Sequence, residues 1–327
     1  MLLVTGGCGL AMSHVARLWL ERHPQARALV LDQAPPDPVV EAFFAPVAGR
    51  LAFRQGDIRD PDLWPSLPPA SHVVHGAAVT SILRLTESGG LAGALPALEA
   101  NIVGTAKLLA WAARQSGLRR LVTVSSGSVY GDQGPAPLPE EGFLAPEGLY
   151  PISKYVGELL TDEAARGFGL PAVTVRLSGV YGPLDRETAS RAVKSLPYRV
   201  MHGALAGREL RVAGLGAVGD YISAGDVGRA VCALLACEAP RHRVYNIAYG
   251  ATVTFGELLA LVRDLVPGAR FCEVPPEQAE VVGDPTQARG RWGAYDISRM
   301  AEDCGWRPRP LGQALAAYRD WLRAQPY

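Results

Sequence analysis

The sequence predicts an α/β protein whose core is a doubly wound parallel sheet, and three observations support that prediction. Short apolar runs alternate with longer amphipathic segments over the first half of the chain, which is typical of strands and helices in a parallel sheet. A glycine-rich turn lies where the first apolar run meets the first amphipathic segment, as at the start of a Rossmann domain. After about residue 177 the alternation becomes irregular, so we expect a smaller C-terminal lobe.

The apolar runs bounded by turn residues are expected to be the strands of the main sheet, and they cover residues 2–5, 28–31, 51–55, 73–75, 120–125, 172–176 and 243–247. A further short strand is expected over 209–212. A first helix should follow the glycine-rich turn and run to about residue 22, and further helices are expected over 96–116, 150–167, 190–202, 226–237, 255–266 and 312–324. The segment 131–148 is rich in proline and glycine, which predicts a loop over the site.

These elements divide the chain into two discontinuous units. Residues 1–176 and 219–248 are expected to form a Rossmann domain that binds a dinucleotide, and residues 177–218 and 249–327 a substrate-binding lobe. In folds of this kind the ligand lies in the crevice at the carboxyl ends of the strands. We therefore expect the functional site between the two units.

The composition of the 327-residue chain is that of an ordinary globular protein, with 48% hydrophobic and 20% charged residues. Lysine plus arginine number 32, and aspartate plus glutamate also number 32, so no net charge attracts nucleic acid or an anionic membrane. The first residues lack the features of a signal peptide, and no apolar run approaches the roughly 18 residues of a membrane helix. We expect neither a nucleic-acid partner nor a membrane partner.

The five cysteines, at positions 8, 232, 237, 272 and 304, are an odd number and form no CxxC pair. That pattern favours reduced thiols in a cytoplasmic protein over a disulfide framework. No cluster of cysteine, histidine and acidic residues has the spacing of a zinc site. No metal is expected.

The segment TGGCGLAM, residues 5–12, joins the first expected strand to the first helix. Glycines there let the backbone approach a pyrophosphate at the helix N-terminus, where amide hydrogens and the helix dipole attract anions. The expected cofactor contacts come from Gly6, Gly9, Leu10 and Ala11. Asp32 follows the second strand, 23 residues after Gly9, and an acid at that spacing accepts hydrogen bonds from the adenosine ribose. Because its charge would repel a 2′-phosphate, the sequence favours NAD over NADP.

Met12 departs from the usual turn, because a third glycine normally stands there and allows the helix to pack closely on the sheet. Either the methionine pushes the helix outward, or its flexible side chain folds into a gap that the small Ala11 helps to provide. The effect on cofactor affinity is left open.

Tyr150 and Lys154 lie four residues apart in YPISK, so on a helix their side chains share one face. A nearby cation favours the phenolate and lowers the pKa of a tyrosine, and Lys154, helped by an oxidised nicotinamide, is expected to supply that charge. Tyr150 can then take a proton from an alcohol while hydride leaves for the cofactor. Ser126 follows a strand and is expected to hydrogen-bond the same oxygen.

Eight stretches occur in a characteristic order along nearly the whole chain: TGGCGLAMSH, the acid Asp32, GDIRD, VVHGAAV, NIVGTAKLL, VSSGSVYG, YPISK and RLSGVYGP. In these stretches the chain resembles the extended short-chain dehydrogenase/reductase family. Members of that family include NAD-dependent nucleotide-sugar epimerases, dehydratases and sugar dehydrogenases.

The resemblance implies further site residues. Asp57 and Ile58 are expected to flank the adenine, and Gly76 and Ala77 to line the cofactor cleft. Asn101 is expected to support a proton relay near Lys154. The residues expected to meet the substrate are Thr80, Ser81, Ser126 and Ser128. The resemblance also implies a homodimer built through two long helices, plausibly 96–116 and 150–167.

Two departures from the nucleotide-sugar epimerases bear on the substrate. Many of those enzymes carry asparagine at the position of Gly179 and arginine at the position of Gly219, and both side chains contact the sugar nucleotide. Loss of a charge-assisted phosphate contact removes about 1.5–3 kcal/mol of binding, unless Arg289 and Arg291 compensate. Gly127 and Ser128 also stand where dehydratases have an Asp-Glu pair, so dehydration is not expected.

The leading hypothesis is therefore an NAD-dependent oxidoreductase that takes hydride from a hydroxyl of a sugar or sugar acid. The alternative is a nucleotide-sugar (UDP-sugar) 4-epimerase, which oxidises C4 transiently and returns the hydride to the other face. A third hypothesis, motivated by Met12, is a binding protein that keeps the fold without catalysis.

Overall fold

The computed structural model describes residues 1–191, 193–283 and 293–324, with the side chains of 83–88 left out. Its main sheet has seven parallel strands in the order β11-β6-β5-β4-β1-β2-β3. They are β1 (Leu2–Thr5), β2 (Ala28–Asp32), β3 (Leu51–Gln55), β4 (His72–His75), β5 (Arg120–Ser126), β6 (Ala172–Leu177) and β11 (Val244–Ile247). The strand order reverses at β1, so the crevice of a doubly wound fold is expected beside the carboxyl ends of β1 and β4. The predicted fold class is confirmed.

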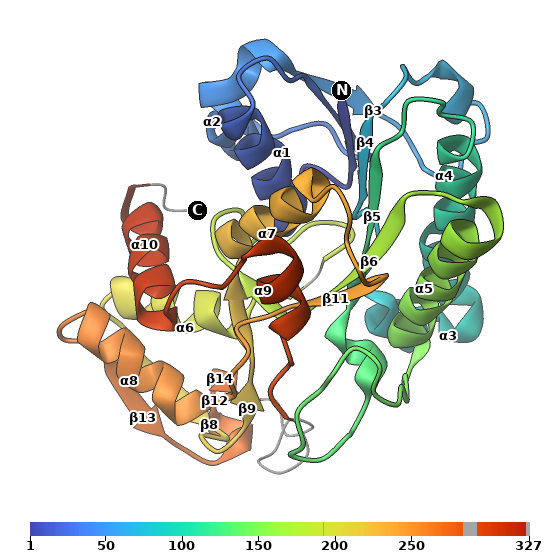
Figure 1. Cartoon of the computed structure of the whole chain (residues 1–327). Helices are drawn as coiled ribbons and strands as arrows, with labels where there is room; N and C mark the ends of the chain where they lie inside the picture. The colour runs from blue at the N-terminus through green and yellow to red at the C-terminus, as the bar shows by residue number, and fades with distance from the viewer. Residues whose placement is uncertain (192, 284–292, 325–327) are drawn as a thin grey trace.

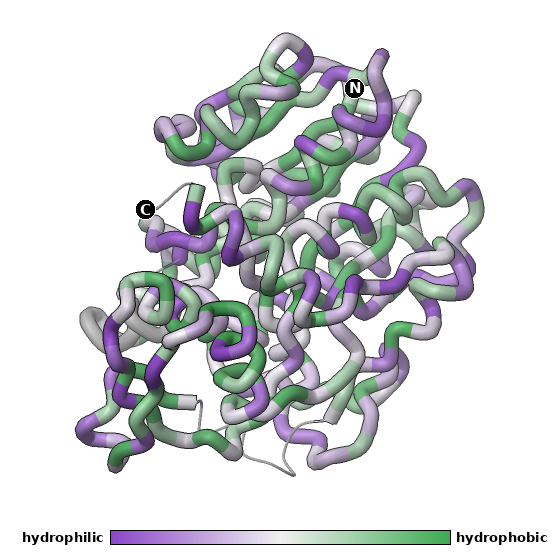
Figure 2. Tube along the Cα trace, turned by 90° about the vertical axis from the view of Figure 1, so that its left-hand side faces the viewer, coloured by the Kyte–Doolittle hydropathy of each residue, from purple (hydrophilic) through white to green (hydrophobic). Residues whose placement is uncertain are grey.

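Helices cover both faces of this sheet because alternate strand residues point to opposite faces. Leu2 and Val4 of β1 belong to a core shared with α1 (Leu10–Arg22) and α7 (Ala224–Ala236). Leu3 belongs to the core on the other face, which it shares with α4 (Thr105–Ala112) and α5 (Leu149–Phe168). Figure 1 shows α1 and α7 on one side of the sheet and α4 and α5 on the other. Hydrophobic and hydrophilic residues alternate along most helices in Figure 2, as in amphipathic helices packed on a core.

One expected helix, 96–116, is divided in the structure. The chain instead forms α3 (Ile82–Leu98), a π-helical turn (Glu99–Gly104) and α4 (Thr105–Ala112). Pro96 lies inside α3, and Gly90 has non-helical backbone angles. Because proline lacks an N–H donor and the π turn changes the hydrogen-bond register, an uninterrupted apolar pattern does not make one regular helix here.

The helix expected over 190–202 begins later, as α6 (Leu196–Leu205). Ser195 caps it by accepting a hydrogen bond from the Tyr198 N–H at 3.2 Å, and Pro197 occupies its first turn. Both residue types favour a helix start. The preceding residues, including a bridge between Thr188 and Arg191, are therefore free to form a wall of the cavity described below.

A smaller group of elements has its own hydrophobic core and lies at the lower left of Figure 1. It contains a three-stranded sheet in the order β13-β8-β14. Its elements are α6, β8 (Glu209–Ala213), α8 (Phe255–Leu265), β13 (Arg270–Glu273), β14 (Val281–Val282) and α10 (Leu311–Ala324). The remaining elements are α2 (Pro38–Phe44), α5 (Leu149–Phe168), α9 (Ser298–Cys304), three short strands β7 (Gly179–Tyr181), β9 (Val218–Gly219) and β10 (Tyr221–Ser223), and β12 (Val253–Thr254). Within the described part of the chain, no helix has the length and apolar character needed to cross a bilayer.

Candidate active site

A cavity of about 1370 Å³ lies at the carboxyl ends of the main strands. Its lining includes the glycine-rich turn and residues of the segments 184–191 and 193–199. Most of the sequence-predicted site residues line it: Gly6, Gly9, Leu10, Ala11, Asp32, Asp57, Ile58, Gly76, Ala77, Thr80, Ser126, Tyr150 and Lys154. Asn101, Ser81 and Ser128 are not among its lining residues.

The turn after β1 brings the chain against the loop after β4. Gly6 has φ +69°, and a Cβ there would lie 2.8 Å from the backbone of Ala77. The Thr5 hydroxyl also accepts a hydrogen bond from the Ala77 N–H at 3.2 Å. Only glycine satisfies both the backbone angle and the close approach. A Cβ at Gly9 would contact only the Gly6 carbonyl oxygen, at 3.1 Å. Because neither glycine carries a side chain, the turn presents its backbone to the cavity.

Asp32, at the end of β2, points back toward the turn. Its carboxylate accepts hydrogen bonds from the Cys8 N–H at 3.0 Å and the Ala34 N–H at 3.3 Å. These bonds fix the carboxylate at the cavity wall and leave acceptor capacity for ribose hydroxyls.

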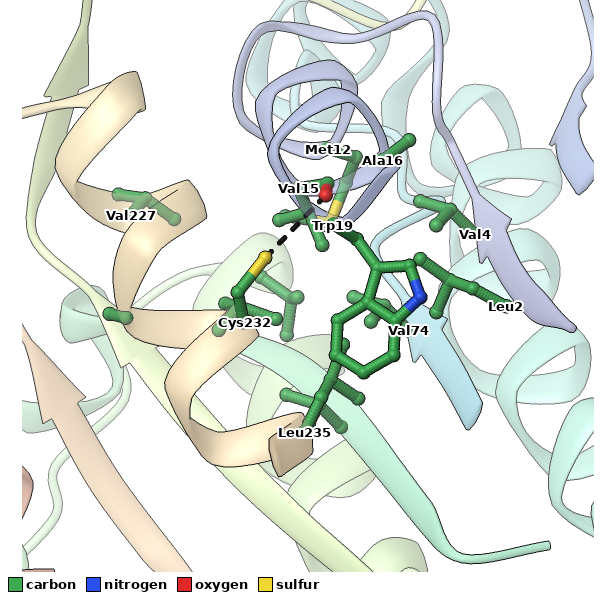
Figure 3. Packing of buried hydrophobic residues seen from close by; sticks show 14 of the residues in the cluster. Leu2, Val4, Met12, Val15, Ala16, Trp19, Val74, Val227, Cys232 and Leu235 are labelled. Atoms are coloured by element: carbon green, nitrogen blue, oxygen red, sulfur yellow. Dashed lines mark hydrogen bonds between the residues drawn. The ribbon is translucent and has the colours of Figure 1, made fainter. Parts of the chain in front are cut away.

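Met12 folds inward and leaves the helix in place. Its side chain is 4% exposed and belongs to the core cluster beneath α1, as Figure 3 shows. A Cβ at Gly76 would lie 2.5 Å from the Met12 sulfur, so the glycine after β4 provides the space that the methionine occupies. Of the two possibilities left open by the sequence, the structure has the inward-folded side chain, beside Gly76.

Asp57 and Ile58 lie at the same end of the cavity as Asp32. The Asp57 carboxylate is paired with Arg59, with Nη2 of the arginine 2.6 Å from Oδ2. The hydrogen bond from Arg59 lowers the pKa of Asp57. Ile58 is buried, and its side chain packs against Gly104.

Tyr150 and Lys154 project from the first turns of α5, and Ser126 ends β5. An interaction with the Ser126 side chain offsets part of the rise that burial causes in the pKa of the Tyr150 hydroxyl. The Ser126 Oγ accepts a hydrogen bond from the Ser128 hydroxyl at 2.9 Å. Ser128 therefore orients Ser126 from behind, outside the cavity lining. The three side chains that the sequence groups together do lie together in the structure.

The electrostatics of the group add a residue that the sequence analysis missed. Burial raises the pKa of Tyr150, and the interaction with Ser126 and the positive charge of Arg191 offset part of that rise. Burial lowers the pKa of Lys154 to about 8, opposed by the negative charge of Glu158. Arg191 comes from the segment before α6, and its sequence context offers no motif that would have indicated it.

Asn101 lies within the π-helical turn, and its side chain is used structurally. Its Oδ1 accepts from the Val79 N–H at 2.8 Å, and its Nδ2 donates to the Val79 carbonyl at 3.1 Å and to the Ser153 hydroxyl at 3.0 Å. These bonds hold the loop after β4 against α5. The expected role of Asn101 in a proton relay stays a prediction.

The loop after β4 also carries Thr80 and Ser81, two of the four residues expected to meet the substrate. Thr80 donates from its N–H and from its hydroxyl to the Ser190 carbonyl, at 2.9 and 2.8 Å. Thr80 thus joins the two walls of the cavity. Ser81 is partly exposed just before α3.

Two further glycines are explained by aromatic side chains. A Cβ at Gly127 would overlap the hydroxyl oxygen of Tyr295, which lines the cavity, and a Cβ at Gly219 would lie 2.5 Å from the Tyr221 ring. The space that a side chain at Gly127 would need is occupied by Tyr295, and the space that one at Gly219 would need is occupied by Tyr221. Arg289 and Arg291 lie outside the described residues.

The geometry fits a dinucleotide. One continuous cavity is lined by the glycine turn, by Leu10 and Ala11 in the first turn of α1, by Asp32 and by Tyr150. The first-turn N–H groups of a helix are suited to binding a phosphate. No group of three or more possible metal ligands occurs in the part of the chain that the structure describes.

A doubly wound sheet with this turn and a Ser–Tyr–Lys group at one cavity defines a dinucleotide-dependent oxidoreductase. The particular family follows from comparison with known proteins. The chain belongs to the NAD dependent epimerase/dehydratase family, whose family model matches residues 2–248. The predicted family, the enzyme class and the choice of NAD are confirmed.

The relatives of the chain act on nucleotide sugars. It is 32% identical to a dTDP-glucose 4,6-dehydratase of Mycolicibacterium smegmatis, over 99% of the chain and 93% of that protein. It is 25% identical to a putative UDP-glucose 4-epimerase of Methanocaldococcus jannaschii, over 99% and 98%. Among solved structures, a dTDP-glucose 4,6-dehydratase double mutant from Streptomyces venezuelae with NAD bound superposes with a TM-score of 0.78 at 27% identity, covering 99% of this chain and 97% of that one.

Proposed function

We propose that this enzyme is an NAD-dependent oxidoreductase that takes hydride from a hydroxyl of a sugar or sugar acid. The observation that carries the proposal is that Ser126, Tyr150 and Lys154, with Lys154 one helical turn from Tyr150, line the same cavity as the glycine-rich turn. NAD, when bound, supplies the hydride acceptor.

The residues of the chain divide the remaining work. Tyr150 accepts the proton of the substrate hydroxyl at its own oxygen, and Ser126 holds that oxygen by a hydrogen bond. Because the pKa of Lys154 is lowered to about 8, this side chain can exchange a proton at moderately alkaline pH.

Dehydration is disfavoured by the packing at Gly127. The dehydratase acid pair would begin at this position, and its first side chain would overlap Tyr295. Similarity to dehydratases therefore supports the fold and the hydride chemistry of the proposal, while the missing acid argues against elimination of water.

The second candidate is a nucleotide-sugar 4-epimerase. It is favoured by Lys194 and Arg199, cationic side chains that line the cavity on the smaller lobe and can attract a diphosphate. The positions of Gly179 and Gly219 argue against it, since neither has room for an added side chain without a shift of its neighbours.

The test is to incubate the protein with NAD and a panel of sugars, sugar acids and UDP-sugars while NADH absorbance is followed and products are analysed. Net NADH with a sugar or sugar acid, abolished by Tyr150→Phe and retained by Tyr155→Phe, is the expected result. Tyr155 is the matched control because it lies on the same helix and does not line the cavity. Conversion of a UDP-sugar to its epimer without NADH would establish the alternative. No thermal shift with millimolar NAD would favour the non-catalytic binding protein.

We also propose that the enzyme is a homodimer formed through α3 and α5. Five large apolar side chains on α3, the π turn and α5 are exposed: Leu91, Leu95, Val103, Ile152 and Leu159. These elements pack beside one another, so the side chains supply an apolar face of the kind that dimers bury. Leu159→Glu should produce a monomer in sedimentation analysis.

A cytoplasmic location is supported by the free state of the five cysteines.

A further inference from the structure

One wall of the cavity is formed by residues of the segments 184–191 and 193–199. Its position is fixed at Thr80, whose N–H and hydroxyl both donate to the Ser190 carbonyl. A second tie is the pairing of Thr188 with Arg191 through reciprocal backbone hydrogen bonds of 2.8 and 3.1 Å. The wall is thus held against the loop after β4, and Arg191 becomes part of the cavity lining, which also includes Tyr150.

Arg191 is held there by a buried acid. Its Nη2 donates to the Oδ1 of Asp185 at 3.0 Å, and Asp185 is fully buried. The same carboxylate accepts the Ser195 N–H at 3.2 Å. Asp185 therefore fixes the guanidinium in one orientation, in the way that a supporting shell orients a binding residue.

The guanidinium has capacity left for a ligand. Arginine carries five N–H donors, and its Nε here is buried with no hydrogen-bond partner among the described residues. The side chain is 29% exposed and lines the cavity. The other charged residues of this wall that line the cavity are Arg186, Glu187, Lys194 and Arg199. Arg186 is paired with Asp37, and Lys194 lies over the Tyr198 ring. Arg199 donates a hydrogen bond to the Glu280 carbonyl.

The position of this cation limits what it can bind. Arg191 and Tyr150 line the same cavity. Arg191 follows Ser190, which is bonded to Thr80, and Val79, next to Thr80, packs against the same apolar cluster as Tyr150. An anion on Arg191 therefore lies on the side of the cavity where the hydroxyl is oxidised. A diphosphate in a sugar nucleotide is separated from the reacting carbon by the sugar ring. A carboxylate belonging to the sugar itself fits that position, and it matches the planar fork of an arginine.

We propose that Arg191 binds the carboxylate of a sugar-acid substrate and thereby selects sugar acids over the corresponding neutral sugars. This inference rests on the proposed oxidoreductase function and narrows its substrate class to an aldonate or uronate. Asp185 is the positioning residue for Arg191. The reaction remains the transfer of a hydride to NAD and of the hydroxyl proton to Tyr150.

The experiment compares binding and turnover in wild-type protein, Arg191→Gln and the exposed control Arg208→Gln, which lies in the smaller lobe away from the cavity lining. The probes are D-gluconate and D-galacturonate, their neutral counterparts D-glucose and D-galactose, and UDP-glucose. Calorimetric titration in the presence of NADH measures binding without turnover. NADH formation in the presence of NAD measures kcat and KM separately.

The expected result is that Arg191→Gln weakens binding of the preferred acid about 10–100-fold, mainly through KM, as for loss of a charge-assisted hydrogen bond. Neutral sugars should change little, and the control should behave as wild type. An equal loss for acid and neutral sugar, with a displaced pH profile, would show instead that Arg191 acts through Tyr150. Tighter binding of UDP-glucose than of either acid, unaffected by Arg191→Gln, would also overturn the inference. Because titration needs no turnover, acid binding that depends on Arg191 without any NADH formation would contradict the oxidoreductase proposal alone.

Discussion

Replacing Gly76 by alanine tests the packing beneath the glycine-rich turn. Gly76 stands after β4, and the Met12 side chain occupies the space next to its Cα. A new Cβ would lie 2.5 Å from the Met12 sulfur, whereas unstrained contacts to carbon lie near 3.5–4.0 Å. Met12 is 4% exposed and packs in the core cluster beneath α1, so moving its side chain away from the new Cβ would cost contacts in that cluster.

The magnitude follows from overpacking and cavity effects. Gly76→Ala alone should lower the free energy of unfolding by about 1–3 kcal/mol. Met12→Ala alone removes a buried side chain and should lower it by about 2–5 kcal/mol. In the double variant the new methyl group occupies part of the vacated volume, so the combined loss should fall short of the sum by roughly 1–3 kcal/mol.

Urea unfolding of the wild type, both single variants and the double variant measures this coupling, and titration with NAD in parallel shows whether the turn has changed shape. Losses that add to within about 0.5 kcal/mol would refute the reasoning, because independent sites add. A wild-type NAD affinity in the double variant would show that the turn itself is intact.

Three other changes test separate features. Glu158→Gln should lower the free energy of unfolding by about 3–5 kcal/mol in urea, because it leaves Arg176 buried without its counter-ion; a loss below 1 kcal/mol, typical of surface pairs, would contradict this. Asp32→Asn should weaken NAD about tenfold or more and improve NADP relative to NAD in fluorescence titrations, and unchanged cofactor preference would show that Asp32 does not contact the ribose. Gly127→Ala should destabilise the protein by about 1–3 kcal/mol, with partial recovery when Tyr295→Phe removes the overlapped oxygen; equal stability with and without Tyr295→Phe would argue against that overlap.

The main sheet could be predicted because each strand is a short apolar run ended by turn residues. Expected and observed bounds agree for β1 and β3, and differ by one residue for β4, which begins at His72. The prediction of one regular helix over 96–116 was wrong, because helical periodicity does not reveal a π turn such as the one at Glu99–Gly104. The late start of α6 was signalled by Ser195 and Pro197, whose local preferences outweigh the apolar pattern before them.

The site could be predicted where it depends on contiguous motifs and could not where it depends on tertiary contact. The spacing of Tyr150 and Lys154 places them on one face of a helix in any fold that keeps α5. The partnership of Met12 with Gly76 joins residues 64 positions apart, and no pattern along the chain indicates it. Arg191 was missed for the same reason, since its role depends on the bonds between Thr80 and Ser190.

The two cations near Tyr150 differ in kind, and the difference assigns them different work. The pKa of Lys154 is lowered to about 8 by burial, so its charge can change at moderately alkaline pH and the side chain can pass a proton. An arginine keeps its charge at any physiological pH, and Arg191 is held by Asp185. A fixed charge is of little use in proton transfer but well suited to binding an anion in one place. Proton handling therefore belongs to the helix that carries Tyr150, and substrate selection to the wall that carries Arg191.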